Sequence, residues 1–328
     1  SEVAAIQDET EALYDAIVTG LRHLDHVRGS ENRFLIGVSG GIDSSVVVCL
    51  LTQALGADRV QAVNMPTQFN AAITQNNARQ VCEKLGVDYL SCPIQDLYEN
   101  LSAKLRATEF ASGPGAYERL VDENVQARIR GNVLMTISNK FGWIVLTTGN
   151  KSEMAMGYAT LYGDMAGGFA VIKDVPKTLV YELCQWRNQN GDPRPAIPEA
   201  IIDKAPSAEL RPDQLDADTL PPYDLLDPIV KAYVEEDYSY QDLLDMGFAE
   251  VSVRQVISFV DRNEYKRRQA PPGVKITRKS RTAIQGSANR KMIMKRAGGS
   301  WAEARAKDGT GKVHLATGRA PGLSSPSE

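Results

Sequence analysis

The sequence predicts an α/β protein with a doubly wound parallel sheet and additional helices toward its C-terminal part. Three observations support this. Apolar strand-like segments alternate with amphipathic helical segments, and a glycine-rich turn at 39–44 and a polar turn at 148–153 each follow a strand-like segment. Alternation of this kind is typical of parallel sheets covered by helices on both faces, in which ligands bind beyond the carboxyl ends of the strands. We therefore expect both turns at one edge of the sheet.

The first predicted element is a helix over 10–27, where Leu13, Ile17, Leu21 and Leu24 recur at helical spacing. The next elements in order are a strand at 34–38, a helix at 44–55, a strand at 60–65, a helix at 74–85, a strand at 87–92, a helix at 120–141 and a strand at 143–147. Prolines then recur among acidic residues from Asn190 to Asp227, and connections of this length are usually functional lids or linkers. Helical patterning returns from Asp227.

The composition excludes several classes of protein. With 328 residues, 43% hydrophobic and 24% charged, and a net charge of −4, the chain reads as an ordinary soluble protein without an apolar stretch that could span a membrane. Its start shows no secretory signal, and the missing initial Met suggests a processed chain or a piece of a longer one. The cysteines form no C-x-x-C pair, which argues against a zinc or redox site and favours buried, reduced thiols in a cytoplasmic enzyme: Cys49, Cys82, Cys92 and Cys184.

The last segment, 281–328, differs in composition from the rest. It has nine Lys and Arg against three Asp and Glu, with few apolar residues. We predict that this segment is a disordered or loosely attached tail. Nucleic-acid binding is an alternative for a basic segment, but we favour a solvated tail and expect neither a nucleic-acid partner nor a membrane partner.

The stretch FLIGVSGGIDSSVVVCLL at 34–51 joins a strand, a glycine turn and a helix. Gly40 and Gly41 leave backbone N–H groups free to face an anion, and the helix adds its positive N-terminal end. Ser39 and Ser44 offer hydroxyl groups to phosphate oxygens. Asp43 would repel bare phosphate, but it suits a Mg²⁺ ion that bridges phosphates. The alternative is a glycine turn with an aspartate at a helix cap.

The string SGGIDSS at 39–45 resembles the loop of the ATP pyrophosphatases, which split ATP between the α and β phosphates. The resemblance implies a Rossmann-like fold of the adenine nucleotide alpha hydrolase type. Five further segments resemble the NAD synthetase family, in particular its glutamine-dependent branch: ENVQARIRGN, VLTTGNKSEMAMGYATLYGDMAGG, DVPKTLVYEL, KAPSAELRPDQ and NEYKRRQAPPGVKIT. The similar region extends over about residues 10–280, with the segments in family order.

The resemblance implies a two-step reaction with ATP, deamido-NAD and ammonia as substrates. The nicotinate carboxylate of deamido-NAD attacks the α-phosphate of ATP, which gives an acyl-adenylate and pyrophosphate. Ammonia then displaces AMP and leaves the amide of NAD. The resemblance also implies Mg²⁺ as cofactor and a homodimer in which the helices at 10–27 and 120–141 make the contacts.

The same resemblance assigns individual residues. Asp43 and Glu153 would hold Mg²⁺, and Lys177 would neutralise the phosphates, so these three are the expected catalytic groups. Contacts to ATP are expected from Gly37, Ser39, Gly40, Gly41, Asp43, Ser44, Met65, Thr148, Lys177 and Ser207. Contacts to deamido-NAD are expected from Asn124, Arg128, Glu153, Tyr265 and Lys266. Without the resemblance, Glu153 could be an ordinary helix carboxylate, Lys177 a surface lysine at a helix start, and Arg128 a solvent-facing side chain.

The chain also departs from the family pattern. Leu161 stands where ammonia-only relatives carry a lysine, which supports the glutamine-dependent branch and removes one expected substrate contact. That branch carries an N-terminal glutaminase domain, so we expect residues 1–280 to be a synthetase domain cut from, or evolved without, its glutaminase. The segment after 277 does not match the family. Two other functions stay open: another ATP pyrophosphatase, such as a tRNA-modifying enzyme, and a nucleotide-binding module without catalysis.

Overall fold

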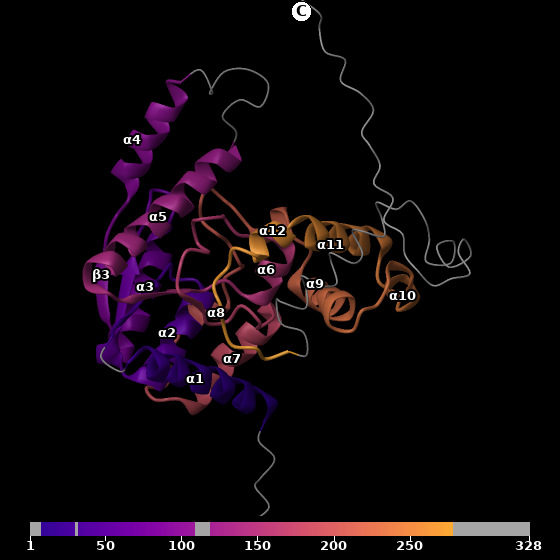
Figure 1. The fold of residues 1–328 in the computed structure, drawn as a ribbon, viewed down its shortest axis with the longest axis horizontal. Helices are drawn as coiled ribbons and strands as arrows, with labels where there is room; N and C mark the ends of the chain where they lie inside the picture. Colours follow the sequence, from indigo (N-terminus) through magenta and orange to yellow (C-terminus); the bar gives the residue numbers. More distant parts are fainter. Residues whose placement is uncertain (1–7, 30–31, 109–118, 278–328) are drawn as a thin grey trace, which may run out of the picture. The chain divides into compact units, whose positions relative to one another are not determined.

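The structure is a computed structural model that describes residues 8–29, 32–108 and 119–277 (Figure 1). The predicted tail at 281–328 lies outside the described residues. Within the described ranges no helix combines the length and the apolar character that a membrane crossing requires.

Within these ranges five parallel strands form one sheet in the order β3-β2-β1-β4-β5. The strands are β1 (Phe34–Gly37), β2 (Val60–Asn64), β3 (Asp88–Ser91), β4 (Ile144–Thr147) and β5 (Phe169–Ala170). β1 pairs with β2 on one side and with β4 on the other, so the direction of winding reverses at β1. The carboxyl ends of two strands at such a reversal border a crevice, which is the usual ligand site of open α/β sheets. The predicted doubly wound α/β fold is confirmed.

The helical elements connect and cover these strands (Figure 1). They are α1 (Glu9–Arg28), α2 (Ile42–Leu55), η1 (Ala57–Arg59), α3 (Ala72–Leu85), α4 (Gln95–Arg106), α5 (Arg119–Phe141), α6 (Lys151–Met156), α7 (Lys177–Asn190), α8 (Glu199–Ile202), η3 (Asp216–Asp218), α9 (Tyr223–Val230), the π-helical turn η4 (Lys231–Glu235), α10 (Tyr240–Asp245), α11 (Glu250–Arg262) and α12 (Glu264–Arg267).

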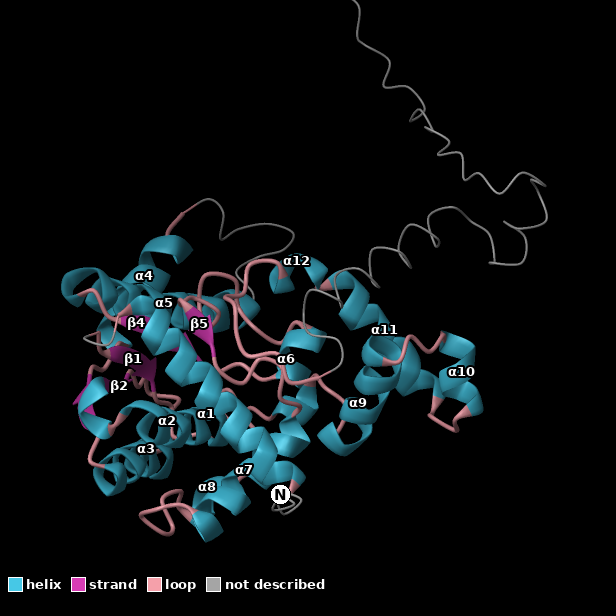
Figure 2. Ribbon diagram, turned by 60° about the horizontal axis from the view of Figure 1, so that its bottom comes forward, coloured by secondary structure: helices cyan, strands magenta, loops and turns pink. Residues whose placement is uncertain are grey.

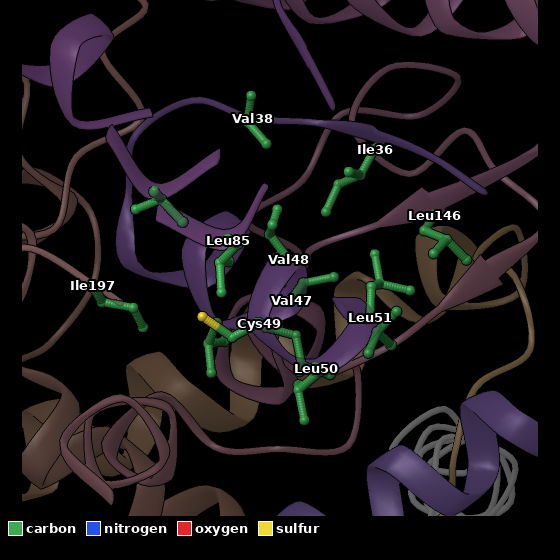
Figure 3. Packing of buried hydrophobic residues seen from close by; sticks show 14 of the residues in the cluster. Ile36, Val38, Val47, Val48, Cys49, Leu50, Leu51, Leu85, Leu146 and Ile197 are labelled. Atoms are coloured by element: carbon green, nitrogen blue, oxygen red, sulfur yellow. The ribbon is translucent and has the colours of Figure 1, made fainter. Parts of the chain in front are cut away.

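Alternate side chains of the strands pack against helices on opposite faces of the sheet. Phe34 and Ile36 of β1 contribute to a core with α1, α2, α3 and α7, whereas Leu35 between them packs with α4 and α5. Figure 2 shows the strands between these two groups of helices. The close view in Figure 3 shows Ile36 of β1, Leu146 of β4 and Leu85 of α3 around α2, with Ile197 at the margin. Residues 44–51 of α2 are all buried, as expected for a helix that follows the central strand.

A second core lies among the helices that follow the proline-rich connection. Side chains of α9, η4, α10 and α11 pack together with Ala155 and Met156 of α6. α6 follows β4 directly, so this helical cluster is attached to the carboxyl edge of the sheet through the element that carries Glu153.

Most predicted elements are confirmed with shifts of one or two residues at their ends. α2 begins at Ile42 rather than Ser44, because Gly41 already has the extended backbone of an N-cap. The predicted return of helix at Asp227 is wrong by four residues, since α9 begins at Tyr223. Prolines at 221, 222 and 228 interrupt the helical pattern in the sequence, so this helix start is not evident there. The connection from Asn190 to Asp227 also contains α8, η3 and the first turn of α9.

Candidate active site

The turn between β1 and α2 has a conformation that requires glycine. Gly40 has φ +86°, and a Cβ atom there would lie 1.9 Å from the carbonyl oxygen of Thr74. Ser39 and Ser44 brace the turn: the Gly41 N–H donates to Ser39 Oγ at 3.2 Å, and Ser44 Oγ donates to the Gly41 carbonyl at 3.1 Å. The turn therefore holds the first residues of α2, including Asp43, at the carboxyl end of β1.

The turn between β4 and α6 reaches the glycine turn through Asn150. The Asn150 side chain caps α6 by accepting from the Glu153 N–H at 3.0 Å, and the Glu153 carboxylate accepts from the Asn150 N–H at 3.1 Å. Asn150 Nδ2 also donates to Asp43 Oδ1 at 2.9 Å. One asparagine thus fixes the two carboxylates, from separate strand ends, next to each other.

Lys177, the first residue of α7, completes this group. Its side chain is buried, and its ammonium is paired with Asp43 Oδ2 and lies 3.7 Å from Glu153 Oε1. Lys177 is therefore not a surface lysine, and Glu153 is not an ordinary helix-face carboxylate. We name Asp43, Glu153 and Lys177 the catalytic-edge cluster, after the role that the sequence analysis predicts for them.

Electrostatics in this cluster favour additional positive charge. Burial, and then the neighbouring charge of Asp43, raise the pKa of Glu153 to about 8. Burial alone would lower the pKa of Lys177, but the carboxylates of Asp43 and Glu153 outweigh it and raise this pKa. Two adjacent carboxylates are the oxygen ligands that Mg²⁺ prefers. No group of three or more metal-binding side chains occurs in the described part of the chain, so phosphate oxygens and water would complete such a shell.

A cavity of about 300 Å³ opens beside the cluster. Nearly all the residues predicted to contact ATP line it: Gly37, Ser39, Gly41, Asp43, Ser44, Met65, Thr148, Lys177 and Ser207. Gly40 does not line the cavity and instead shapes the turn. The proline-rich connection contributes the stretch from Lys204 to Leu210 to the wall, so part of this connection is at the site rather than a plain linker.

The residues predicted to contact deamido-NAD lie farther apart. Asn124 accepts from Thr160 Oγ1 at 2.7 Å, and the Arg128 side chain, which is exposed, donates to the Leu161 carbonyl at 3.2 Å. Arg128 lines a second hollow of about 380 Å³, which shares Gly131 and Ala166 with the first.

Tyr265 and Lys266 line neither cavity. The Tyr265 side chain is exposed, and the Lys266 ammonium donates to the carbonyls of Gly157 and Ala159 at 2.7 and 2.8 Å. Lys266 thus supports the segment after α6. Their contacts with substrate stay predictions.

Sequence analysis missed several residues at this site. Arg130 lines the cavity and donates to the carbonyl of Met65 at 3.0 Å, and burial lowers its pKa to about 10. Asp216 also lines the cavity and accepts from Tyr223 Oη at 2.8 Å, while the Tyr223 ring centroid lies 5.6 Å from Lys177 Nζ. Asn150 is another residue absent from the predicted site. It alone has a signal in the sequence, because an asparagine three residues before a glutamate is a capping-box pattern.

Similarity to known proteins identifies the family of this chain. The family model described as NAD synthase matches residues 13–270, which is most of the chain. The chain belongs to the NAD synthase family. The match includes the glycine turn and all three members of the catalytic-edge cluster.

Two similar curated proteins are the glutamine-dependent NAD(+) synthetases of Thermotoga maritima and Acinetobacter baylyi. The first is 47% identical over 267 residues, which is 81% of this chain and 45% of that protein. The second is 46% identical over 271 residues, which is 82% of this chain and 49% of that protein. This member of the NAD synthase family therefore spans about half the length of the curated relatives it matches.

Solved structures give the same fold. The glutamine-dependent NAD+ synthetase from Acinetobacter baumannii, in complex with ADP, superposes with a TM-score of 0.59 at 38% identity, over 88% of this chain and 52% of that one. The NH3-dependent NAD synthetase from Campylobacter jejuni superposes with a TM-score of 0.61 at 24% identity, over 79% and 96%. The second likeness supports the fold alone.

Proposed function

We propose that this chain catalyses the ATP-dependent amidation of deamido-NAD to NAD, with release of AMP and pyrophosphate. The observation that carries the proposal is the convergence of Asp43, Glu153 and Lys177 at the end of a cavity lined by the glycine turn. These residues come from the starts of three separate helices, α2, α6 and α7. A buried lysine beside two carboxylates suits a reaction in which negative charge develops on a pyrophosphate that leaves the α-phosphate.

Each member of the cluster has a role in the first step. The glycine turn and the start of α2 bind the phosphates, where backbone N–H groups and the helix end favour negative charge. Lys177 neutralises the charge that develops on pyrophosphate as the bond to the α-phosphate breaks. Asp43 and Glu153 would hold Mg²⁺, which would screen the negative charge of the phosphates.

In this reaction the nicotinate end of deamido-NAD would lie so that its carboxylate reaches the α-phosphate of ATP. Asn124 and Arg128 lie on one helix face of α5, and an amide and a guanidinium suit the polar and anionic groups of a dinucleotide. The two connected hollows would accommodate ATP and deamido-NAD side by side. Tyr265 and Lys266 line neither hollow, and we keep them as predicted contacts of the dinucleotide.

The proposed nitrogen donor is ammonia rather than glutamine. Glutamine hydrolysis needs an activated nucleophile, commonly a thiolate. Burial raises the pKa of Cys49 and Cys82 to about 12 and also raises that of Cys184. The described histidines, His23 and His26, are exposed on α1, whereas these three thiols are buried. A glutaminase domain or subunit would have to supply ammonia if glutamine is the source in the cell. Equal NAD formation from ammonium and from ammonia-free glutamine would contradict this part.

The proposal includes a homodimer. The apolar face of α1 is buried against α2 and α7, whereas α5 exposes Leu120, Met135 and Phe141. We expect α5 to supply more of the contact than α1. Light scattering should give twice the chain mass, and a fully active monomer would refute the dimer.

One experiment separates the proposal from its alternatives. The chain is incubated with ATP, Mg²⁺ and ammonium, with and without deamido-NAD, and AMP and pyrophosphate are measured. We expect both products in equal amounts, formed only when deamido-NAD is present. Release that depends on tRNA instead would support another ATP pyrophosphatase, and binding of ATP without release would support a non-catalytic module.

A further inference from the structure

Helix α7 begins without a cap of its own. Its N-cap residue is Pro176, which has no side-chain acceptor for the first backbone N–H groups. The first N–H groups of a helix lack partners inside the helix and need acceptors from elsewhere when they are buried. Lys177 and Thr178 carry two of these groups, and Lys177 is the lysine of the catalytic-edge cluster.

The two acceptors come from α6 and α9. The Lys177 N–H donates to Ser152 Oγ at 2.9 Å, and the Thr178 N–H donates to Asp227 Oδ2 at 3.0 Å. Asp227 Oδ2 also accepts from Thr178 Oγ1 at 2.9 Å, while Asp227 Oδ1 accepts from the Ser152 hydroxyl. Ser152 is fully buried and Asp227 is 8% exposed, so water competes little for these bonds.

This arrangement fixes two members of the catalytic-edge cluster at once. Ser152 directly precedes Glu153 in α6, and Thr178 directly follows Lys177 in α7. Because one carboxylate binds both helix starts, the spacing between the Glu153 and Lys177 backbones depends on Asp227. Asp227 belongs to α9 of the second core and does not line the cavity.

We propose that Asp227 is a positioning residue that acts through Ser152 and Thr178 to hold Glu153 and Lys177 in register for adenylation. The inference rests on the proposed function. It deepens that function by assigning a role to the helical cluster that follows the proline-rich connection. Asp227 touches no reacting atom in this account, so its effect is geometric.

The variants separate a geometric role from a role of the negative charge. Asn at 227 can still accept from the Thr178 N–H and can donate to Ser152 Oγ, so Asp227→Asn should keep kcat within about 3-fold of wild type. Asp227→Ala and Ser152→Ala remove the link, and a displacement of the cluster by a fraction of an ångström to 1 Å should lower kcat about 10- to 100-fold. The KM for ATP should change much less, because the glycine turn that binds the phosphates does not contact Asp227. The double variant should be no worse than Asp227→Ala alone.

Glu235→Ala is the matched control. Glu235 is also a buried carboxylate from the second core, and it pairs with Lys151, which directly precedes Ser152. Its removal should lower the melting temperature about as much as Asp227→Ala, while kcat stays near wild type. If Asp227→Ala does not fold, Ser152→Ala carries the test, because a serine-to-alanine change is compatible with a buried helix position.

The assay follows AMP formation in the full chain, together with amide hydrogen exchange at residues 177 and 178. Support requires a loss of kcat in Ser152→Ala, retention in Asp227→Asn and Glu235→Ala, and faster exchange at Lys177 in Ser152→Ala. A wild-type kcat in Ser152→Ala, or an equal loss in Glu235→Ala, would overturn the inference. If the wild-type chain forms no AMP, the proposed function fails separately. In that case amide exchange alone decides whether Ser152 and Asp227 cap α7. Unchanged exchange at Lys177 and Thr178 in both Ser152→Ala and Asp227→Ala would overturn the inference.

Discussion

Two buried lysines of this protein have nearly the same immediate surroundings. Lys177 lies between Asp43 and Glu153, and Lys151 lies between Asp174 and Glu235. Both lysine side chains are 3% exposed. The carboxylates differ: those beside Lys177 are 18% and 19% exposed and line the cavity, whereas those beside Lys151 are 3% and 9% exposed and do not.

The remaining partners of the two groups explain this difference. Around Lys151, Asp174 accepts from the backbone of Ile276 and Thr277, and Thr277 Oγ1 also contacts the Lys151 ammonium at 2.7 Å. That group fastens residues 276–277 to the start of α6 and has a full set of protein partners. The catalytic-edge cluster keeps carboxylate oxygens at a cavity wall. Access to a cavity, rather than burial or charge, therefore distinguishes the group suited to bind a ligand from the group that stabilises the fold.

The largest expected effect is on stability and concerns the Lys151 group. Lys151→Met removes the cation from two deeply buried carboxylates, which should lower the free energy of unfolding by about 3–5 kcal/mol. Activity per folded molecule should change little, because no partner of this lysine lines the cavity. Urea unfolding followed by circular dichroism measures the loss. An unchanged midpoint would show that the two lysine sites do not differ as described.

The matching change at the other lysine should affect catalysis instead. Lys177→Met removes the cation that balances charge on pyrophosphate, and the loss of one such group typically lowers kcat about 100- to 1,000-fold. Stability should fall less than in Lys151→Met, because water reaches Asp43 and Glu153 through the cavity. Pyrophosphate release at saturating ATP and Mg²⁺ is the measurement. Near-normal release would remove Lys177 from the mechanism.

A smaller effect concerns the response to ligand. Saturating Mg²⁺ and ATP should stabilise the wild type by about 2.7 kcal/mol at an ATP concentration 100 times Kd. Asp43→Asn keeps the side-chain volume but removes one charge from the expected Mg²⁺ shell, so most of this stabilisation should disappear. Asp174→Asn should lower the starting melting temperature and keep the increment. An equal increment in both variants would contradict the assignment of Mg²⁺ to Asp43 and Glu153.

Much of the fold could be predicted because its pattern is local. The strand, glycine turn and helix at 34–55 carry their own signals, and the amphipathic spacing of α1 is visible in the sequence. β5 has only two residues, Phe169 and Ala170, which is too short for a periodic pattern. α4 is not among the predicted elements. Leu97, Leu101 and Leu105 recur there every four residues, but their side chains are exposed rather than in the core.

The candidate site was predictable to the extent that its residues lie at strand ends or in family motifs. Asp43, Glu153 and Lys177 were expected on those grounds, and the structure brings them together. The residues that hold them were not, because long-range hydrogen bonds leave no trace in spacing. Asp227 is 75 residues from Ser152 and 49 from Thr178, and in the sequence it is one acid among several at the end of a proline-rich segment.

The most direct test of the proposed chemistry follows one oxygen atom. Deamido-NAD labelled with ¹⁸O in its nicotinate carboxylate is converted with ATP, Mg²⁺ and ammonium, and the AMP is analysed by mass spectrometry. If the carboxylate attacks the α-phosphate and ammonia then breaks the bond between the carbonyl carbon and that oxygen, one ¹⁸O atom appears in AMP. Label in inorganic phosphate with ADP as co-product, or NAD formed with unlabelled AMP, would contradict adenylation at the catalytic-edge cluster.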